Sequence, residues 1–183
     1  GMELGKPLEG KGIKLLGYME NGIRHMTDNV RPIKTPADMK GLKMRTQQNR
    51  LHMKYFTDLG ANPTPLPFTE IYNSLATKLV DGQENGLVAI DSGKLYEVQK
   101  YVTLSNHGYL GYAVITNKKF WDSLSSDVRS QLEQAMKEAT DYANKIAQEE
   151  NDKSLEAIRK SGKTQVYTPT KDEKLAFKKA LVP

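Results

Sequence analysis

The sequence predicts an α/β protein, with a mixed β-sheet flanked by helices and a long C-terminal amphipathic helix. Short strand-like and helix-like segments alternate along much of the 183-residue chain, as they do in α/β domains. Hydrophobic residues make up 38% and charged residues 27%, which is ordinary for a chain that buries a core. Apolar residues recur at helical spacing between Ser126 and Lys160, which predicts the long helix.

The N-terminal segments predict strands around one compact helix. Residues 12–19 and 23–27 are rich in strand-forming residues and are expected to form two strands. Residues 35–41 combine a capping threonine, a proline at the first helical position and a terminal glycine, which predicts a short helix. Leu42–Thr46 alternates apolar and basic residues as a half-buried strand does, and Arg45 lies near its end.

The middle of the chain predicts two helices separated by an extended segment. Asn49–Leu59 is expected to be a helix that Gly60 stops. Asn62–Phe68 contains three prolines and must be extended, so it cannot be a central antiparallel strand throughout. Thr69 is expected to cap a helix over Glu70–Leu79, which Asp81 and Gly82 end.

The C-terminal segments predict further helices and strands. Residues 87–94 are expected to be a short helix, and residues 101–104 and 109–116 to be strands. The helix from Ser126 to Lys160 would span roughly 50 Å and ends before Gly162. Its predicted apolar face consists of Val128, Leu132, Ala135, Met136, Ala139, Tyr142, Ala143, Ile146 and Ala147. Lys171–Leu181 predicts a final amphipathic helix.

Composition and missing motifs argue against several functional classes. The chain contains no cysteine, which excludes thiol catalysis, disulfides and thiolate metal sites. His25, His52 and His107 lack metal-ligand spacing, so neither a metal site nor a cofactor is expected. We find no G-x-S-x-G, H-E-x-x-H, Walker A or G-x-G-x-x-G motif, and we do not expect an enzyme. The N-terminus has no basic region followed by an apolar segment, and Gly1 before Met2 resembles a scar of tag removal.

The basic balance of the chain leaves a nucleic-acid module as an alternative. The formal net charge is +5, but the lysines are scattered rather than gathered in a stripe. A solvated surface is therefore the preferred interpretation. The alternative predicts salt-sensitive binding to DNA.

Polar residues near predicted strand ends could hold an anion. Arg45 closes one strand, Arg24 follows Asn21-Gly22, Asn85 follows an acidic turn, and Phe68 ends the proline-rich segment. Arginine can hold a carboxylate with two parallel hydrogen bonds, while asparagine adds neutral donors and phenylalanine an apolar wall. Ligand sites of open α/β sheets lie outside strand ends. For each arginine alone, a surface ion pair remains the ordinary alternative.

Six phrases in register carry a family resemblance. They are Asn21-Gly-Ile-Arg24, Pro36-Ala-Asp-Met-Lys-Gly-Leu-Lys-Met-Arg45, Leu59-Gly-Ala-Asn-Pro-Thr-Pro, Phe68-Thr-Glu-Ile-Tyr72, Val80-Asp-Gly-Gln-Glu-Asn85 and Tyr96-Glu-Val-Gln-Lys-Tyr101. With them the sequence resembles the DctP family, the solute-binding proteins of tripartite ATP-independent periplasmic (TRAP) transporters. The likeness covers nearly the whole chain, from about residue 12 to about residue 180.

The resemblance implies a periplasmic binding protein-like (class II-like) lobe that binds a small organic acid. It implies that Arg45 holds the ligand carboxylate, that Arg24 and Asn85 assist, and that Phe68 and Leu66 line the pocket, with weaker support for His107 and Tyr112. Family members usually have proline where this chain has Gly86, which should loosen the turn but keep Asn85.

The resemblance also implies that the N-terminal lobe is largely missing. Residues 1–116 would then be the second lobe, and residues 117–183 the helical region that normally spans both lobes. We expect exposed apolar faces to be covered by dimerisation or helix exchange. The implied location is periplasmic and the implied partners are membrane permease subunits, whereas the alternative is a folded remnant that binds nothing.

Overall fold

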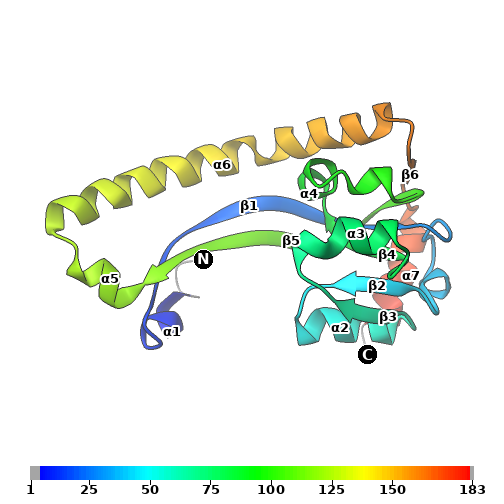
Figure 1. Ribbon diagram of the computed structural model, residues 1–183, viewed down its shortest axis with the longest axis horizontal. Coiled ribbons are helices and arrows are strands. Elements are labelled where there is room, and N and C mark those ends of the chain that lie inside the picture. The colour runs from blue at the N-terminus through cyan, green and yellow to red at the C-terminus, as the bar shows by residue number, and fades with distance from the viewer. Residues whose placement is uncertain (1–4, 182–183) are drawn as a thin grey trace. The chain divides into compact units, whose positions relative to one another are not determined.

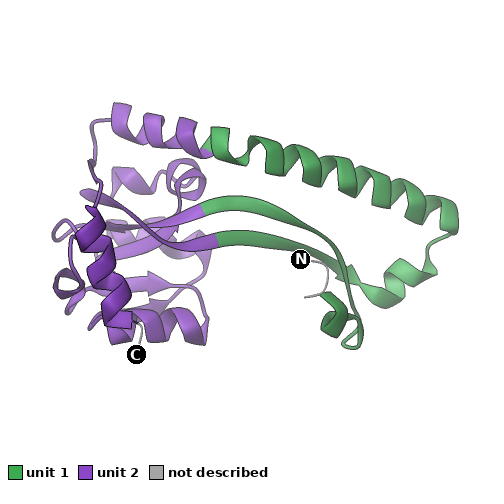
Figure 2. Cartoon of the chain, turned by 180° about the vertical axis from the view of Figure 1, so that it is seen from behind, with its two compact units in different colours: residues 1–22, 110–150 green, residues 23–109, 151–183 purple. Residues whose placement is uncertain are grey.

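The chain forms two compact units in the computed structural model, which describes residues 5–181. Unit 1 comprises residues 1–22 and 110–150, and unit 2 comprises residues 23–109 and 151–183 (Figure 2). The predicted boundary at residue 116 refers to the lobes of a longer fold and stays a prediction.

A single mixed sheet runs through the fold (Figure 1), with strand order β3-β2-β4-β1-β5-β6. The strands are β1 (Ile13–Asp28), β2 (Lys43–Thr46), β3 (Asn62–Pro65), β4 (Gly82–Gly86), β5 (Tyr101–Asn117) and β6 (Gln165–Tyr167). Strand β2 is parallel to both β3 and β4, and β5 is parallel to β6. Strand β4 is antiparallel to β1. The mixed sheet confirms the predicted fold class.

The helices agree with the sequence prediction best at the C-terminal end. They are α1 (Lys6–Glu9), α2 (Arg50–Asp58), α3 (Ile71–Ala76), α4 (Leu87–Ser92), α5 (Lys118–Ser123), α6 (Ser126–Lys160) and α7 (Lys171–Leu181). Short 3-10 helices cover Pro36–Met39, Phe68–Glu70 and Leu95–Glu97. The predicted bounds of α6 and α7 are confirmed, because an amphipathic period sustained over many residues is a strong signal. Helix α5 was not predicted.

Two predicted pairs of strands are each one continuous strand. Residues 13–19 and 23–27 belong to β1, which continues through Gly22 at φ +140°, whereas Gly12 precedes the strand. The segments 101–104 and 109–116 belong to β5, which continues through Asn106 at φ +50°. Glycine and asparagine tolerate positive φ better than other residues, so these positions bend the chain without ending the strand.

The helix predicted over residues 70–79 is shorter, and Thr69 does not cap it. Thr69 lies inside the 3-10 helix, and α3 ends at Ala76 before Lys78 adopts φ +61°. Ile71 and Leu75 are fully buried, but Leu79 is 58% exposed. The four-residue spacing therefore identified the buried face but overestimated the length of the helix.

The sequence predicts a turn at residues 81–84, and Gly82–Gly86 has no β-branched or aromatic residue, but these residues form strand β4. It is nevertheless fully buried between β2 and β1. A Cβ at Gly82 would lie 2.3 Å from the Thr27 carbonyl oxygen, so only glycine permits this close approach. Tertiary packing here overrides the local propensity.

Two buried clusters hold the sheet of unit 2. Met26, Ile33, Met39, Leu42, Met44, Phe56, Leu59 and Ala61 form one cluster, against which Phe177 and Leu181 of α7 pack. Ile71, Leu75, Val80, Leu87, Ile90, Leu95, Tyr96, Val102 and Ile158 form the other. Successive side chains of a strand point to opposite faces of the sheet. The sheet therefore separates the side chains that contact one cluster from those that contact the other.

Unit 1 contains the outer parts of β1 and β5, helix α5 and most of α6. Trp121 is its most buried large side chain among the described residues, at 4% exposure. The Asn144 side chain accepts from the Glu20 amide at 2.8 Å and donates to the Tyr18 carbonyl at 3.1 Å, which attaches α6 to β1. The predicted apolar face of α6 is largely uncovered, since Tyr142 is 65% exposed. None of the described helices is long and apolar enough to cross a membrane.

Candidate functional site

The carboxyl ends of the parallel strands β2 and β4 bring Arg45 and Asn85 to one face of the sheet. Met44 faces the cluster beneath the sheet and pairs with Gly82 across the parallel ladder. Because side chains alternate, Arg45 and Asn85 both point to the opposite face. The sequence prediction that both residues come from strand ends is confirmed for Arg45, whereas Asn85 lies within a strand that was not predicted.

Arg45 is buried but has no acidic partner among the described residues. Its side chain is 3% exposed, and its Nε and Nη2 donate to the Leu66 carbonyl at 2.9 and 2.6 Å. Burial lowers the pKa of Arg45, and the neighbouring Glu84 charge opposes that shift. An arginine nevertheless remains protonated. A backbone carbonyl thus orients a buried cation whose charge no carboxylate neutralises by direct contact.

Asn85 belongs to a chain of amide hydrogen bonds on the same face. Its Nδ2 donates to Gln83 Oε1 at 3.1 Å, and Gln83 Nε2 donates to Thr27 Oγ1 at 3.0 Å. Thr27 Oγ1 in turn donates to Gln99 Oε1 at 2.6 Å. All four side chains are buried, so the chain of bonds fixes the orientation of the Asn85 amide.

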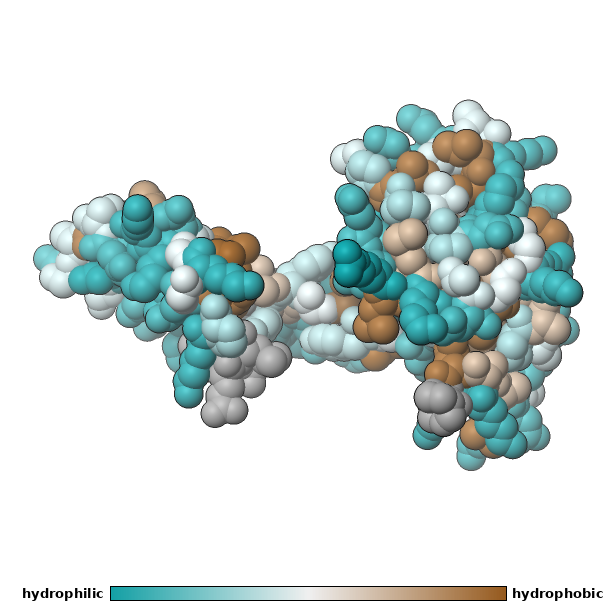
Figure 3. Space-filling model, turned by 90° about the horizontal axis from the view of Figure 1, so that it is seen from below, coloured by the Kyte–Doolittle hydropathy of each residue, from teal (hydrophilic) through white to brown (hydrophobic). Residues whose placement is uncertain are grey.

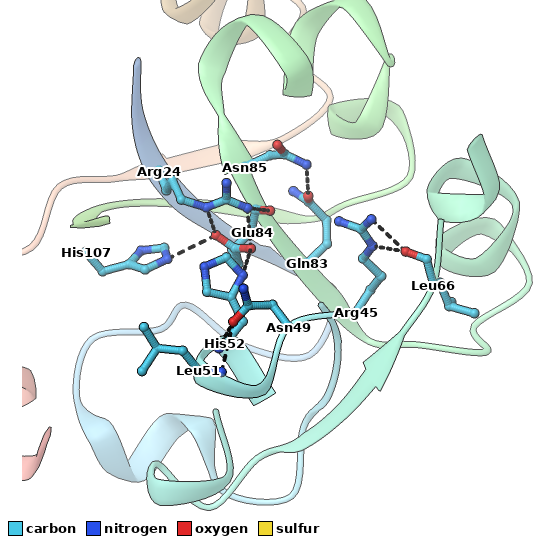
Figure 4. Close-up of polar contacts among 10 residues, drawn as sticks. All are labelled: Arg24, Arg45, Asn49, Leu51, His52, Leu66, Gln83, Glu84, Asn85 and His107. Atoms are coloured by element: carbon cyan, nitrogen blue, oxygen red, sulfur yellow. Dashed lines mark hydrogen bonds and ion pairs between the residues drawn. The ribbon is translucent and has the colours of Figure 1, made fainter. Parts of the chain in front are cut away.

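Arg24 lies on the other face of the sheet and is paired with Glu84 (Figure 4). The Arg24 Nε and Nη2 donate to the two Glu84 carboxylate oxygens. Both side chains are at most 3% exposed. The Glu84 carboxylate therefore neutralises the Arg24 charge by direct contact, and the assistance of Arg24 in ligand binding stays a prediction.

Two histidines distant in sequence flank the Glu84 carboxylate (Figure 4). His107 Nε2 is 3.3 Å from Glu84 Oε2, and His52 Nδ1 is 4.0 Å from Oε1. Burial raises the pKa of Glu84, but hydrogen bonds from His107 and Arg24 outweigh it and hold that pKa below its usual value. Glu84 consequently stays ionised at neutral pH.

The remaining predicted site residues are dispersed. Phe68 is 50% exposed in the 3-10 helix after β3, and Leu66 packs against the cluster around Ile71. Tyr112 belongs to unit 1, where its hydroxyl accepts from Asn21 Nδ2 at 3.1 Å. Their roles in binding stay predictions.

The backbone conformation of Gly86 is one that a proline could also adopt. Its φ is −69°, close to the value that a proline ring imposes. The substitution of glycine for the usual proline therefore leaves the backbone beside Asn85 in a proline-compatible conformation.

Sequence reasoning gave no role to Glu84, His52 or Gln83. A signal was present, since Gln83, Glu84 and Asn85 are three consecutive polar residues. Read as a strand, they would alternate and divide between the two faces of the sheet. The described residues contain no group of three or more histidine or acidic residues that could hold a metal ion.

His25, beside Asn85 in the sheet, predicts a loss of stability on acidification. Burial, and to a smaller extent the nearby His107 and Lys174 charges, lowers the pKa of His25 to about 4. The folded state therefore binds fewer protons than the unfolded state, whose histidine has a pKa of 6.5, and stability falls as the pH drops from 6.5 toward 4. Between pH 7 and pH 5, the free energy of unfolding of His25→Gln is expected to fall by about 2 kcal/mol less than that of the parent. Urea unfolding at the two pH values measures the difference.

Asp28→Asn provides a control of opposite sign. Burial raises the pKa of Asp28 to about 6 against the hydrogen bonds from the Val30 and Arg31 amides. Its contribution to stability is thus greatest below pH 3.8 and is lost as the pH rises toward 6. Asp28→Asn should lose more stability than the parent on acidification, and identical pH profiles for all three proteins would contradict both assignments.

The mixed sheet flanked by helices is an α/β fold, and the buried arginine and oriented amide near the ends of its parallel strands are groups that can hold an anion. The chain belongs to the DctP family, the bacterial extracellular solute-binding proteins, family 7, whose sequence profile matches residues 1–183. The recognition made from the six phrases is therefore confirmed.

Relatives with known names and structures agree. The C4-dicarboxylate-binding periplasmic protein DctP of Rhodobacter capsulatus is 48% identical over 176 residues, which are 96% of this chain and 53% of that protein. The 2,3-diketo-L-gulonate-binding periplasmic protein YiaO of Escherichia coli is 39% identical, over 99% of this chain and 54% of that protein. A TRAP periplasmic solute-binding protein of Shewanella oneidensis, crystallised with succinate, superposes with a TM-score of 0.96 at 38% identity, over 98% of this chain and 59% of that one. The chain spans about half the length of the curated relatives it matches.

Proposed function

We propose that this chain supplies the carboxylate-binding half of the ligand site of a TRAP transporter solute-binding protein, with Arg45 as the principal contact. The ligand is a small organic acid. Its carboxylate accepts hydrogen bonds from the guanidinium edge of Arg45 that the Leu66 carbonyl leaves open, and Asn85 adds a neutral donor from the same face.

The observation that carries this proposal is the state of Arg45. A buried guanidinium costs free energy unless an anion or other acceptors satisfy it, yet its hydrogen-bond partner is one carbonyl oxygen. Arginine offers five N–H donors, so donors remain for a carboxylate. The names of the relatives support an organic acid, since they include binders of C4-dicarboxylates and of a diketo sugar acid.

The direct test is a titration of the chain with succinate, 2,3-diketogulonate and a neutral analogue, succinamide. Calorimetry and NMR monitor the binding of each compound. We expect both acids to bind and the amide not to bind. Binding of all three with equal affinity would contradict an ionic contact.

We also propose that the complete protein acts outside the cytoplasmic membrane and delivers its ligand to TRAP membrane permease subunits. This extends the family assignment, and no enzymatic role is included, because the relatives are named as binding proteins. Co-purification of the ligand-loaded protein with the permease subunits tests it.

The alternative function is a folded fragment that binds nothing. It is favoured by the partial span, since the chain matches 53% of the Rhodobacter relative and that protein's further ligand contacts can lie outside the shared part. Absence of any NMR shift at tens of millimolar succinate would favour this alternative over the carboxylate site.

We propose further that two copies associate through an apolar surface of unit 1. Phe120, Ile115, Val128 and Leu132 are all at least 39% exposed, and contiguous apolar surface, where such side chains form it, is generally covered. Light scattering is expected to give about twice the mass of one chain. Val128→Glu with Leu132→Glu should give a monomer, and Glu133→Lys on the same helix should leave the dimer intact. A monodisperse monomeric parent would refute this association.

A further inference from the structure

A cavity lies in unit 2, and neither Arg45 nor Asn85 lines it. It has a volume of about 320 Å³ and lies between α7, α2 and the β5 segment around Asn106. Met26, Tyr55, Pro169, Phe177 and Leu181 supply its apolar wall, and Ser105, Asn106, His107, Lys174 and Lys178 its polar groups. The volume falls within the usual range of small-molecule sites, about 300–1,000 Å³. In Figure 3, apolar surface in brown lies near the described end of α7 in the larger unit.

The charge of this cavity is positive and unneutralised. Lys174 and Lys178 both line it, and no aspartate or glutamate does. They stand four residues apart on α7, so they share one helix face. The Lys174 charge lowers the pKa of the buried His25, which indicates that its field reaches the interior. A site with two ammonium groups and no carboxylate favours an anion.

A buried hydroxyl on the wall adds a hydrogen-bond donor. The Tyr55 hydroxyl is buried without a hydrogen-bond partner, although buried polar groups are normally paired. Its ring stacks on His107 at a centroid distance of 5.6 Å and meets Phe56 edge-on at 5.0 Å, which fixes its position. Burial, and after it the nearby Glu84 charge, raises the pKa of Tyr55 well above its usual value, so the hydroxyl keeps its proton and can donate a hydrogen bond.

We propose that this cavity binds a small amphipathic carboxylate, whose apolar body packs on Met26, Phe177 and Leu181 and whose charge pairs with Lys174 and Lys178. The Tyr55 hydroxyl is a further donor for the bound anion. The site is distinct from the Arg45 site, because neither Arg45 nor Asn85 lines it.

Three probes of the unmodified chain separate the two requirements of this site. Phenylacetate has both the charge and the apolar body, 2-phenylethanol has only the body, and acetate has only the charge. NMR titration, with the methyl signal of Met26 as the local reporter, measures the three affinities. Phenylacetate is expected to bind at least about tenfold more tightly than 2-phenylethanol or acetate.

Matched variants of α7 test the lysines. Lys174→Gln with Lys178→Gln is expected to weaken phenylacetate binding by about tenfold or more, since charged hydrogen bonds are the stronger ones. Lys171→Gln with Lys179→Gln changes the net charge equally on exposed positions that do not line the cavity, and should leave the affinity within about twofold.

The outcomes separate this proposal from the function proposed above. Arg45→Ala is expected to leave phenylacetate binding unchanged, and loss of binding in that variant would assign phenylacetate to the Arg45 site and overturn the second site. Three other outcomes would also overturn the second site. They are equal affinities for phenylacetate and 2-phenylethanol, equal losses of phenylacetate affinity in the two double lysine variants, and no shift of the Met26 signal. A failure of succinate to bind while phenylacetate binds would leave the second site standing alone.

Discussion

The Arg45→Ala variant is expected to bind succinate at least about 100-fold more weakly than the parent chain, because two charge-assisted hydrogen bonds are lost. Arg45→Lys should recover little of this affinity, since an ammonium cannot present the parallel pair of N–H groups that a carboxylate accepts. Calorimetry, or NMR where the affinity is in the millimolar range, measures each dissociation constant.

Arg50→Ala is the matched control for this prediction. Arg50 is an exposed arginine in the first turn of α2, only five positions away in the sequence. Its replacement also removes one positive charge, so a general electrostatic effect would weaken binding in both variants. Equal affinities of the parent and Arg45→Ala would refute the proposed carboxylate contact.

The Glu84→Ala variant is expected to lose about 3–5 kcal/mol of unfolding free energy, because it leaves Arg24 buried without its partner. Arg24 and Glu84 are at most 3% exposed, so water cannot replace the lost contact without a rearrangement. Urea unfolding at neutral pH measures the loss. Glu84→Gln keeps a hydrogen-bond acceptor and should lose less.

Two further variants show whether an unpaired charge causes this loss. Arg24→Leu combined with Glu84→Leu removes both charges and should recover most of the stability. Glu156→Ala removes an exposed carboxylate that pairs with Lys160 on α6, and should cost little of the unfolding free energy, because solvent screens the pair. If Glu84→Ala cost no more than Glu156→Ala, the buried pair would not stabilise the fold.

The sequence predicted the fold most accurately where one structural signal extends over many residues. The bounds of α6 and α7 follow from a helical apolar period, and the site of α2 from Asn49 and Gly60, which cap and end it. Strand β4 could not be found in this way, because its burial between β2 and β1 depends on partners far away in the sequence.

Sequence reasoning selected candidate site residues, whose role in binding stays a prediction, but it could not find their pairings. Arg45 and Asn85 were identified, and the structure brings them to one face of the sheet. The pairing of Arg24 with Glu84 joins strands 60 residues apart, and nothing in the local sequence distinguishes a buried ion pair from a free arginine. The approach of His52 and His107 to the same carboxylate likewise depends on the folded topology.

The acceptor that orients Arg45 is a main-chain oxygen, that of Leu66. No amino-acid replacement at position 66 deletes that oxygen. The orientation of the guanidinium therefore does not depend on which side chain stands at position 66. Under the proposed function, the neighbouring Leu66 and Phe68 side chains can therefore diverge, or be redesigned, to suit acids of different shape while Arg45, the proposed anchor for the charge, keeps its orientation. Changes in ligand preference within such a pocket need not pass through variants that have lost the anchor.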